Sequence, residues 1–336
     1  MAANGTADHA AETLASYLKQ LLPSESRSQL RDTVLPKLLH TISLVARALR
    51  ESQHIALAGT ANAFGDDQLN VDVIAEDLIR AALAECPAVV AASSEEDPVE
   101  RHQHLGREQI SEEQYTVAFD PLDGSSIIAP NWTVGTIIGI WDGATALNQD
   151  PREKQIGAIL GVLGPRATAI IALRVPGSEP ACFEVGFRDD QASTEITITR
   201  PAVRLAPPPF KTRYFAPANL RAAAEDERYM ALVARFVKDK YTLRYSGGLV
   251  PDVAHALSKG HGVYVSPVTG GSGAKLRRLY ELCPVALVAE CAGGRAVDPA
   301  GGRDVLAVPV RDCDERGGLV CGTGEDVEMV AAALGA

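Results

Sequence analysis

Two carboxylates three residues apart stand at the end of an apolar run and form the motif with the clearest chemical potential in the chain. Residues 115–119 are mostly apolar and predict a buried strand, which ends at Asp120, Pro121, Leu122 and Asp123. The proline fixes φ, and the leucine carbonyl can turn outward. Carboxylate and carbonyl oxygens are hard ligands that suit Mg²⁺ or Mn²⁺. A plain turn between two strands would use the same residue types, and we favour the metal site.

The residues that follow, Gly124, Ser125 and Ser126, offer unhindered backbone N–H groups and two hydroxyls. Such donors at the start of a helix are typical of phosphate-binding sites. A second apolar segment, 134–141, comes next in the chain. The motif therefore combines candidate metal ligands with candidate phosphate donors.

A second acidic cluster lies upstream. Glu95 and Glu96 follow a predicted short buried strand at 88–92, a position where acidic residues usually form a surface turn. Together with Asp120 and Asp123, they become a second source of metal ligands at an adjacent strand end.

Two further aspartates lie near the start of a predicted helix at 68–85. Asp72 falls close to its first turn, and Asp66 lies six residues earlier in a loop rich in Gly and Ala, 58–67. A solvated acid in the first turn of a helix is the common explanation for such an Asp. The residue types alone do not show whether Asp72 is such a solvated acid or a functional residue.

The C-terminal half contributes basic residues near another Glu. The run 270–275 suggests a nucleotide loop, but that loop requires Gly-Lys-Ser/Thr, and a leucine follows the lysine here. Lys275, Arg277 and Glu281 fall in a predicted helix, 275–282. By residue types alone, this is an amphipathic helix with a solvated basic face.

The elements that must position these residues divide the chain into two parts. Two amphipathic helices, 30–49 and 68–85, open the N-terminal part. Strand-like segments separated by turns then predict an antiparallel meander: 133–141, 157–163, 168–174, 182–187 and 195–199. A proline run at 207–209 predicts the boundary between an N-terminal α+β domain, 1–206, and a C-terminal α/β domain, 207–336.

Beyond that boundary, helices and strands alternate, which is typical of an α/β layer. The predicted helices are 220–238, one that ends at Leu257, 275–282 and one at the C-terminus; the predicted strands are 241–245, 263–265, 287–290 and 319–321. Most candidate metal ligands thus fall in the first domain, and the basic residues fall in the second.

Composition narrows the class of protein. The chain has 336 residues, of which 46% are hydrophobic and 22% charged, as in an ordinary globular protein. The formal charge of −11 argues against nucleic acid or an anionic membrane as a partner. Its six cysteines show no zinc spacing and are expected to be reduced thiols. No apolar run reaches the ~18 residues of a membrane span, and the N-terminus resembles neither a signal nor a transit peptide, so we expect a cytoplasmic protein.

The motif Asp-Pro-Leu-Asp-Gly-Ser-Ser, preceded by Ser-Glu-Glu-Asp at 94–97, resembles the metal-dependent sugar bisphosphatases of the fructose-1,6-bisphosphatase superfamily. Ile127 follows it, as in the sedoheptulose-1,7-bisphosphatase branch, whereas fructose bisphosphatases usually have Asn there. The resemblance extends from about Leu30 to near the C-terminus. It implies a layered α-β-α-β-α fold, with α+β and α/β halves, and hydrolysis of the 1-phosphate of sedoheptulose 1,7-bisphosphate.

The resemblance also assigns roles to residues. Two or three Mg²⁺ or Mn²⁺ ions per active site are implied, with the ligands Glu95, Asp120, the Leu122 carbonyl, Asp123 and Glu281. The residues implied to activate water or order the catalytic loop are Asp66, Asp72 and Glu96. The implied substrate-binding residues are Asp123, Gly124, Ser125, Ser126, Asn219, Arg244, Tyr245, Lys275 and Arg277. The family's counterpart of Arg244 reaches across a subunit interface, which implies a homodimer or homotetramer.

Three features depart from the family pattern. Ala222 stands where fructose bisphosphatases have a phosphate-binding Tyr, which suggests a wider distal pocket with one donor fewer. The family's sugar-stacking Tyr has no clear counterpart around Tyr264 and Val265. The loop before Asp66 lacks the cysteine pair of light-regulated chloroplast members.

Three alternatives follow from the same residues. A fructose-1,6-bisphosphatase, or an enzyme that accepts both sugars, is the nearest. An inositol monophosphatase-type enzyme shares the Asp-Pro-x-Asp-Gly core but does not explain the basic residues of the C-terminal half. An inactive paralogue that binds metabolites is the third, and the presence of every acidic ligand argues against it.

Overall fold

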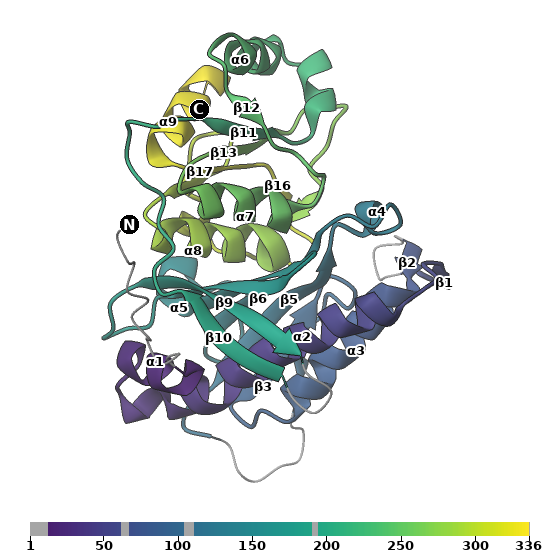
Figure 1. The fold of residues 1–336 in the computed structure, drawn as a ribbon, viewed down its shortest axis with the longest axis vertical. Coiled ribbons are helices and arrows are strands. Elements are labelled where there is room, and N and C mark those ends of the chain that lie inside the picture. The colour runs from purple at the N-terminus through teal and green to yellow at the C-terminus, as the bar shows by residue number, and fades with distance from the viewer. Residues whose placement is uncertain (1–12, 62–66, 104–110, 190–193, 336) are drawn as a thin grey trace, which may run out of the picture.

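The computed structural model describes residues 13–61, 67–103, 111–189 and 194–335. Layers of helix, sheet, helix, sheet and helix follow one another along the molecule (Figure 1). This confirms the fold class predicted from the sequence, with a mostly antiparallel N-terminal sheet and an α/β C-terminal half. No helix within these ranges combines the length and apolar character needed to cross a membrane.

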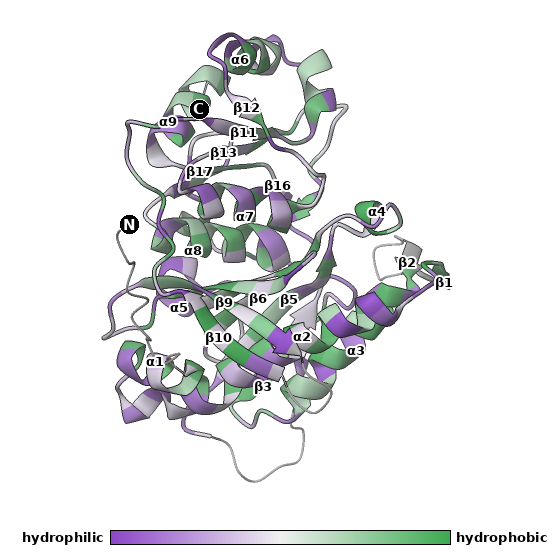
Figure 2. Ribbon diagram, viewed as in Figure 1, coloured by the Kyte–Doolittle hydropathy of each residue, from purple (hydrophilic) through white to green (hydrophobic). Residues whose placement is uncertain are grey.

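The outer layer of the N-terminal half consists of helices with one apolar face. These elements are α1 (Leu14–Leu21), η1 (Glu25–Arg27), η2 (Leu30–Val34), α2 (Leu35–Glu51) and α3 (Asn70–Ala84). Leu38, Leu39 and Ile42 of α2 are fully buried in the core beneath the large sheet. Purple and green alternate along α2 and α3 in Figure 2, as expected for helices that cover a sheet.

The large sheet has eight strands in the order β10-β9-β8-β7-β6-β5-β3-β4. Their bounds are β3 (Val89–Ser94), β4 (Arg101–His102), β5 (Tyr115–Asp123), β6 (Val134–Asp142), β7 (Gln155–Leu163), β8 (Ala167–Leu173), β9 (Ala181–Asp189) and β10 (Thr194–Arg200). The predicted meander is confirmed from β6 to β10, and β5 extends it as the antiparallel neighbour of β6. Strands β3 and β5 are parallel neighbours, with Ser94 beside Phe119, so their carboxyl ends meet at one edge.

The smaller sheet has the order β12-β11-β13-β17-β15, in which β12, β11 and β13 are parallel. The strands are β11 (Tyr214–Pro217), β12 (Thr242–Leu243), β13 (Val263–Ser266), β15 (Arg295–Val297) and β17 (Leu319–Gly322). The helices of this half are η3 (Leu220–Ala224), α6 (Glu227–Lys238), α7 (Leu249–Lys259), η4 (Arg278–Leu282), α8 (Cys283–Cys291), η5 (Val305–Ala307) and α9 (Gly324–Leu334).

Six short elements complete the described chain. The hairpin β1 (Leu57–Ala61) and β2 (Asp67–Leu69) precedes α3, and β14 (Leu276–Arg277) pairs with β16 (Arg316–Gly317). The helical turns α4 (Ser125–Ile128) and α5 (Pro151–Lys154) follow β5 and β6.

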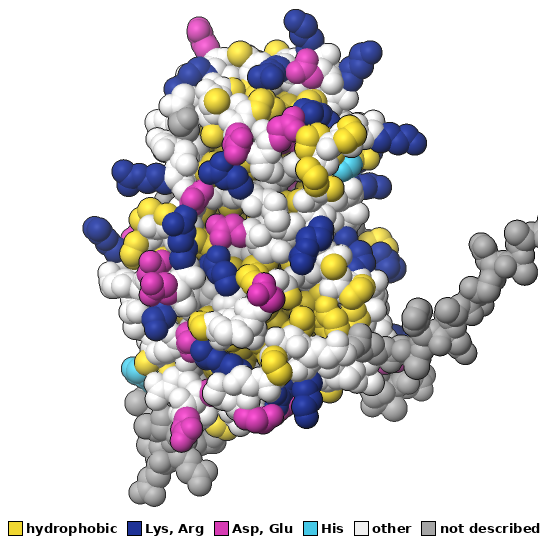
Figure 3. Space-filling view, turned by 90° about the vertical axis from the view of Figure 1, so that its left-hand side faces the viewer, with side chains coloured by type: hydrophobic (Ala, Val, Ile, Leu, Met, Phe, Trp, Pro, Cys, Tyr) yellow, Lys and Arg dark blue, Asp and Glu magenta, His cyan; other side chains and the backbone are white. Residues whose placement is uncertain are grey.

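Helices α7 and α8 form the middle layer and contact strands of both sheets. The division at residue 206 therefore stays a prediction, because these C-terminal helices pack directly on the N-terminal sheet. All six cysteines lie in the described part of the chain; they are buried, and none of them forms a disulfide. Positive and negative side chains are interspersed on the face that Figure 3 shows.

Several predicted elements differ from those in the structure. The predicted strand 287–290 is wrong, because these residues belong to α8, which is buried on nearly all sides. A fully apolar run carries no helical or strand periodicity, so its pattern could not separate the two. Most of β1 and the first residue of β2 fall in the predicted loop at 58–67. The predicted helix 220–238 is broken between η3 and α6. The helix expected at 275–282 begins only at Arg278.

Candidate active site and metal centre

Three buried carboxylates, Asp120, Asp123 and Glu281, converge at the end of β5. Each offers an oxygen, and these oxygens all lie within 4.8 Å of one another. The first two come from β5, and the third comes from the π-helical turn η4 that packs on this strand. The structure thus brings together carboxylates separated by nearly half of the chain.

A bulge in β5 explains how its two aspartates reach the same cluster. Residues three apart in a regular strand point to opposite faces. Asp120 pairs with Ile137, but Asp123 pairs with Gly135, so three steps along β5 match two steps along β6. The extra residue changes the direction of the strand and lets both carboxylates lie on one side.

Backbone N–H groups hold both aspartates in place. Asp120 Oδ1 accepts a hydrogen bond from the Leu122 N–H at 2.9 Å. The Asp123 carboxylate accepts from the Leu249 N–H at 3.1 Å and the Val250 N–H at 2.6 Å. These two donors begin α7, where the helix dipole favours a negative charge. Sequence reasoning missed this contact, because nothing in the local pattern links residues so far apart.

The carboxylates perturb one another. Burial raises the pKa of Asp120 and Glu281 well above the ordinary values, and neighbouring carboxylates, with Glu95 first among them, raise both further. Burial also raises the pKa of Asp123 to about 6, against the two N–H donors that lower it. Buried like charges are unfavourable unless a cation offsets them. A set of hard oxygen donors that repel one another fits a divalent cation such as Mg²⁺ or Mn²⁺.

Glu95 lies beside this cluster and pairs with Arg277. It follows β3, and its backbone N–H donates to the Phe119 carbonyl at 3.0 Å. Arg277 Nη1 donates to Glu95 Oε1, and the arginine side chain is only 3% exposed. Arg277 lies in the extended β14, ahead of the helix in which it was predicted. A candidate metal ligand and a candidate substrate ligand are therefore ion-paired with each other in this structure.

Asp72 and the serine loop form the next part of the site. Ser125 Oγ lies 3.2 Å from both Asp72 Oδ1 and the Leu122 carbonyl oxygen. Asp72 Oδ2 accepts the Leu69 N–H at 2.8 Å, and the side chain is 3% exposed. Burial raises its pKa. The explanation of Asp72 as a solvated first-turn acid is therefore wrong, whereas Asp66 lies outside the described residues.

The other residues of the loop face open space. Gly124 has a φ of 95°, a left-handed conformation that favours glycine. Ser125 and Ser126 are exposed at the start of α4, and Glu96 is partly buried next to Glu95. The backbone donors and hydroxyls predicted to bind phosphate are thus accessible beside the carboxylates.

The predicted substrate residues of the C-terminal half lie at the carboxyl ends of parallel strands. Asn219 Nδ2 donates to the carbonyls of Pro267, at 2.7 Å, and Ser272, at 3.1 Å. Lys275 is exposed, and the Tyr245 side chain is 45% exposed. By contrast, Tyr264 belongs to the hydrophobic core between the sheets and is 6% exposed.

Ala222 does not have the environment expected from the sequence. It is fully buried, in a hydrophobic cluster that includes Phe215 and Tyr229. Its methyl group therefore packs inward, and the expectation that this residue widens a distal pocket receives no support from its position.

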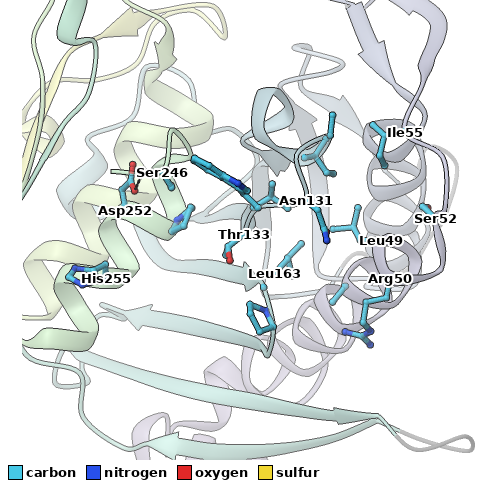
Figure 4. A pocket seen from close by; sticks show the side chains of 18 of the residues that line it. Leu49, Arg50, Ser52, Ile55, Asn131, Thr133, Leu163, Ser246, Asp252 and His255 are labelled. Carbon is cyan, nitrogen blue, oxygen red and sulfur yellow. Dashed lines mark hydrogen bonds between the residues drawn. The ribbon is translucent and has the colours of Figure 1, made fainter. Parts of the chain in front are cut away.

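A groove of about 1170 Å³ runs between the end of α2 and the start of α7. Figure 4 shows Leu49, Arg50, Ser52 and Ile55 on one wall and Ser246, Asp252 and His255 on the other. Arg244 lines this groove; it is exposed, and its guanidinium stacks 5.8 Å from the Tyr214 ring centre.

Asp252 is a residue of this region that sequence reasoning did not identify. Its carboxylate accepts the Ser246 N–H at 2.7 Å and the Gly247 N–H at 3.4 Å, so it holds the turn after Tyr245. Burial raises its pKa to about 6. The only sequence signal for Asp252 is an acidic residue four positions after a Gly-Gly pair. This pattern is too common to identify a functional residue.

Comparison with known proteins agrees with this arrangement. The model of the fructose-1,6-bisphosphatase N-terminal domain matches residues 17–184, and that of the C-terminal domain matches residues 209–335. The chain is 36% identical to the chloroplastic sedoheptulose-1,7-bisphosphatase of Chlamydomonas reinhardtii, over 91% of this chain and 72% of that protein. It is 32% identical to the class 1 fructose-1,6-bisphosphatase of Citrifermentans bemidjiense, over 89% and 88%.

A solved structure from Toxoplasma gondii, described as a candidate sedoheptulose-1,7 bisphosphatase, superposes with a TM-score of 0.82. It is 32% identical and covers 96% of this chain and 98% of its own. The fold, the carboxylate cluster and the two family matches lead to one conclusion. The chain belongs to the fructose-1,6-bisphosphatase family, whose members are metal-dependent phosphatases that hydrolyse sugar bisphosphates.

Proposed function

We propose that the protein hydrolyses the 1-phosphate of sedoheptulose 1,7-bisphosphate and releases sedoheptulose 7-phosphate and inorganic phosphate. The observation that carries the proposal is the buried cluster of Asp120, Asp123 and Glu281 next to the open Gly124–Ser126 loop. The carboxylates can hold cations. The phosphoryl group can then lie between these cations and the hydrogen-bond donors of the loop.

The proposed metal ligands are Glu95, Asp120, the Leu122 carbonyl, Asp123 and Glu281, for two or three Mg²⁺ or Mn²⁺ ions. When bound, such cations neutralise phosphoryl charge and lower the pKa of a bound water. Glu95 must then release Arg277, whose guanidinium becomes available to the substrate phosphate. Before cations bind, the ion pair between Glu95 and Arg277 compensates both charges.

Acidic residues around the loop control protons in this proposal. Asp72 Oδ1 accepts the Ser125 hydroxyl and so orients it, and its raised pKa suits a group that takes up a proton. Glu96 and Asp66 are proposed to share the activation of water. Gly124, Ser125 and Ser126 donate to the oxygens of the transferring phosphoryl group, where negative charge develops.

The far phosphate is proposed to bind Asn219, Arg244, Tyr245, Lys275 and Arg277. Binding energy from this remote group supports the reaction at the other end of the sugar. Arg244 lines the groove between α2 and α7, where no carboxylate of the cluster lies. This position supports a homodimer or homotetramer in which Arg244 serves the active site of a neighbouring subunit.

The choice of a seven-carbon sugar rests on Ile127 and on the similarity to sedoheptulose bisphosphatases. Ile127 is 9% exposed and packs around the Gly247–Gly248 turn, which leads into α7. A hydrophobic residue therefore takes the place of the polar Asn that is usual in fructose bisphosphatases.

Turnover of both bisphosphates, measured side by side with Mg²⁺, tests this choice. We expect sedoheptulose 1,7-bisphosphate to have the higher kcat/KM by about ten-fold, because one extra carbon unit is worth only about 1–3 kcal/mol. Equal or better turnover of fructose 1,6-bisphosphate would contradict the choice of the seven-carbon sugar. It would favour the six-carbon sugar for which the class 1 relatives are named. Failure to release phosphate from either sugar would contradict the enzyme assignment itself.

A further inference from the structure

Three parallel strands of the smaller sheet end at the same edge. Arg244 and Tyr245 follow β12, Asn219 and Arg221 follow β11, and the loop that leads to Lys275 follows β13. In open α/β sheets, ligands bind outside the carboxyl ends of the strands. Arg221 is the one residue of this group to which neither the sequence nor the family resemblance assigned a role.

The backbone around Arg221 is fixed against the loop before Lys275. Asn219 begins η3 in a left-handed conformation, with a φ of 47°, and its amide donates to two carbonyls of the loop. Glu225 at the other end of η3 accepts from Thr269 Oγ1 at 2.7 Å and from the Gly271 N–H at 2.8 Å. The turn that carries Arg221 is therefore tied to the loop at both of its ends.

The side chain of Arg221 faces outward. Ala222 and Ala223 are 0% and 5% exposed and anchor η3 in the hydrophobic cluster, whereas Arg221 is exposed. Within the described part of the chain, Arg221 takes part in no hydrogen bond or ion pair, whereas nearby Arg213 and Arg228 each pair with an acid.

The Arg221 guanidinium interacts electrostatically with the Tyr245 hydroxyl. Burial raises the pKa of the Tyr245 hydroxyl, and Asp252 raises it further, but the positive charge of Arg221 acts in the opposite direction. The acids nearby are already engaged: Glu225 holds the loop, and Asp252 holds the turn at Ser246. Within the described residues, Arg221 and Lys275 are exposed at this edge and pair with no acid, so both can bind an anion.

We infer that Arg221 binds the far phosphate of the sugar bisphosphate, beside Tyr245 and Lys275. The inference rests on the proposed function and adds a residue to its substrate site. A free guanidinium on a fixed turn can donate two parallel hydrogen bonds to a phosphate. It supplies the donor that the inward-facing Ala222 cannot.

Inhibition by sedoheptulose 7-phosphate tests the inference, because this product carries only the far phosphate. Arg221→Ala should raise its inhibition constant, and the KM for the bisphosphate, by about 10- to 100-fold, as expected for loss of a charge-assisted hydrogen bond. Arg221→Lys should retain much of the binding. Arg235→Ala removes an exposed arginine from α6, which pairs only with Asp239 within the described residues, and should behave as wild type.

Hydrolysis of fructose 1-phosphate, which lacks the far phosphate, separates binding from structure. Its kcat/KM should be the same in Arg221→Ala and wild type. An unchanged inhibition constant, or an equal loss with fructose 1-phosphate, would overturn the inference. If wild type prefers fructose 1,6-bisphosphate, the proposed sugar is wrong, but fructose 6-phosphate then replaces the seven-carbon inhibitor and the test of Arg221 stands.

Discussion

At the scale of single residues, the carboxylate cluster combines two opposite demands. Asp120, Asp123 and Glu281 are close enough to hold cations together, and for the same reason they repel one another. The Arg277 guanidinium, which pairs with Glu95, compensates part of that charge. Removal of one carboxylate should therefore have opposite effects on catalysis and on the stability of the metal-free protein.

Asp120→Asn tests this. Activity with Mg²⁺ should fall by at least about 10³-fold, because the variant loses a charged ligand of cations that stabilise the transition state. The melting temperature of the metal-free variant should equal or exceed that of wild type, because a buried like charge is gone. Asp77→Asn, an exposed aspartate of α3, is the matched control and should change neither quantity. Near-normal turnover of Asp120→Asn would contradict the metal assignment.

Asp252 should make stability depend on pH. Its native pKa of about 6 lies above the ordinary value of about 3.9, so the native state binds more protons between these two pH values. The stability that this group contributes is therefore present at low pH and is lost as the pH rises through about 6.

Asp252→Asn removes this dependence while keeping an acceptor for the Ser246 N–H. Denaturant unfolding of the metal-free proteins should show the variant gaining stability relative to wild type as the pH rises from about 4 to 6, with no further change above that. A difference that is constant with pH, or that changes in the other direction, would exclude a raised pKa at this site.

At the scale of elements, the motifs predicted which segments matter, and their mutual arrangement could be predicted only in part. The strand ends that carry Glu95 and Asp120 could be predicted, because each is an apolar run that ends at acidic residues. The bulge between Asp120 and Asp123 could not, because it depends on pairing with β6. The strand expected at 287–290 failed for a related reason: α8 is buried between two sheets and has no polar face to reveal its period.

The contact between β6 and α7 offers a prediction at this scale. A Cβ on Gly135 would lie 2.3 Å from the Val250 Cβ, so Gly135→Ala must push α7 away from the sheet. We expect the variant to lose about 1–3 kcal/mol of stability, as overpacked sites do. Its Mg²⁺-dependent activity should fall as well, because the first N–H groups of α7 hold Asp123.

Gly301→Ala is the control for this experiment, since a Cβ there meets nothing within 4 Å. Unfolding and turnover measured on both variants separate a local clash from a general effect of alanine. Full activity in Gly135→Ala would show that the position of α7 does not influence the cluster.

At the scale of the whole molecule, the proposed exchange of Arg244 between subunits can be tested by mixing variants. Arg244→Ala subunits keep their carboxylates, and Asp120→Asn subunits keep their arginine. Coexpression of the two should restore bisphosphate turnover above that of either variant alone, since a mixed oligomer contains one complete site. Coexpression of Asp120→Asn with Asp123→Asn should restore nothing. If neither mixture recovers activity, Arg244 does not serve the active site of a neighbouring subunit.

The hydrogen bonds from the start of α7 to Asp123 connect two processes that are usually considered separately. The same carboxylate belongs to the acidic cluster and joins the C-terminal half to the N-terminal sheet. Any cation that binds this carboxylate must also change how firmly α7 is held, and by thermodynamic reciprocity any movement of α7 must change cation affinity equally. The layer between the two sheets is therefore a place where packing can regulate metal content without a contact at the metal itself.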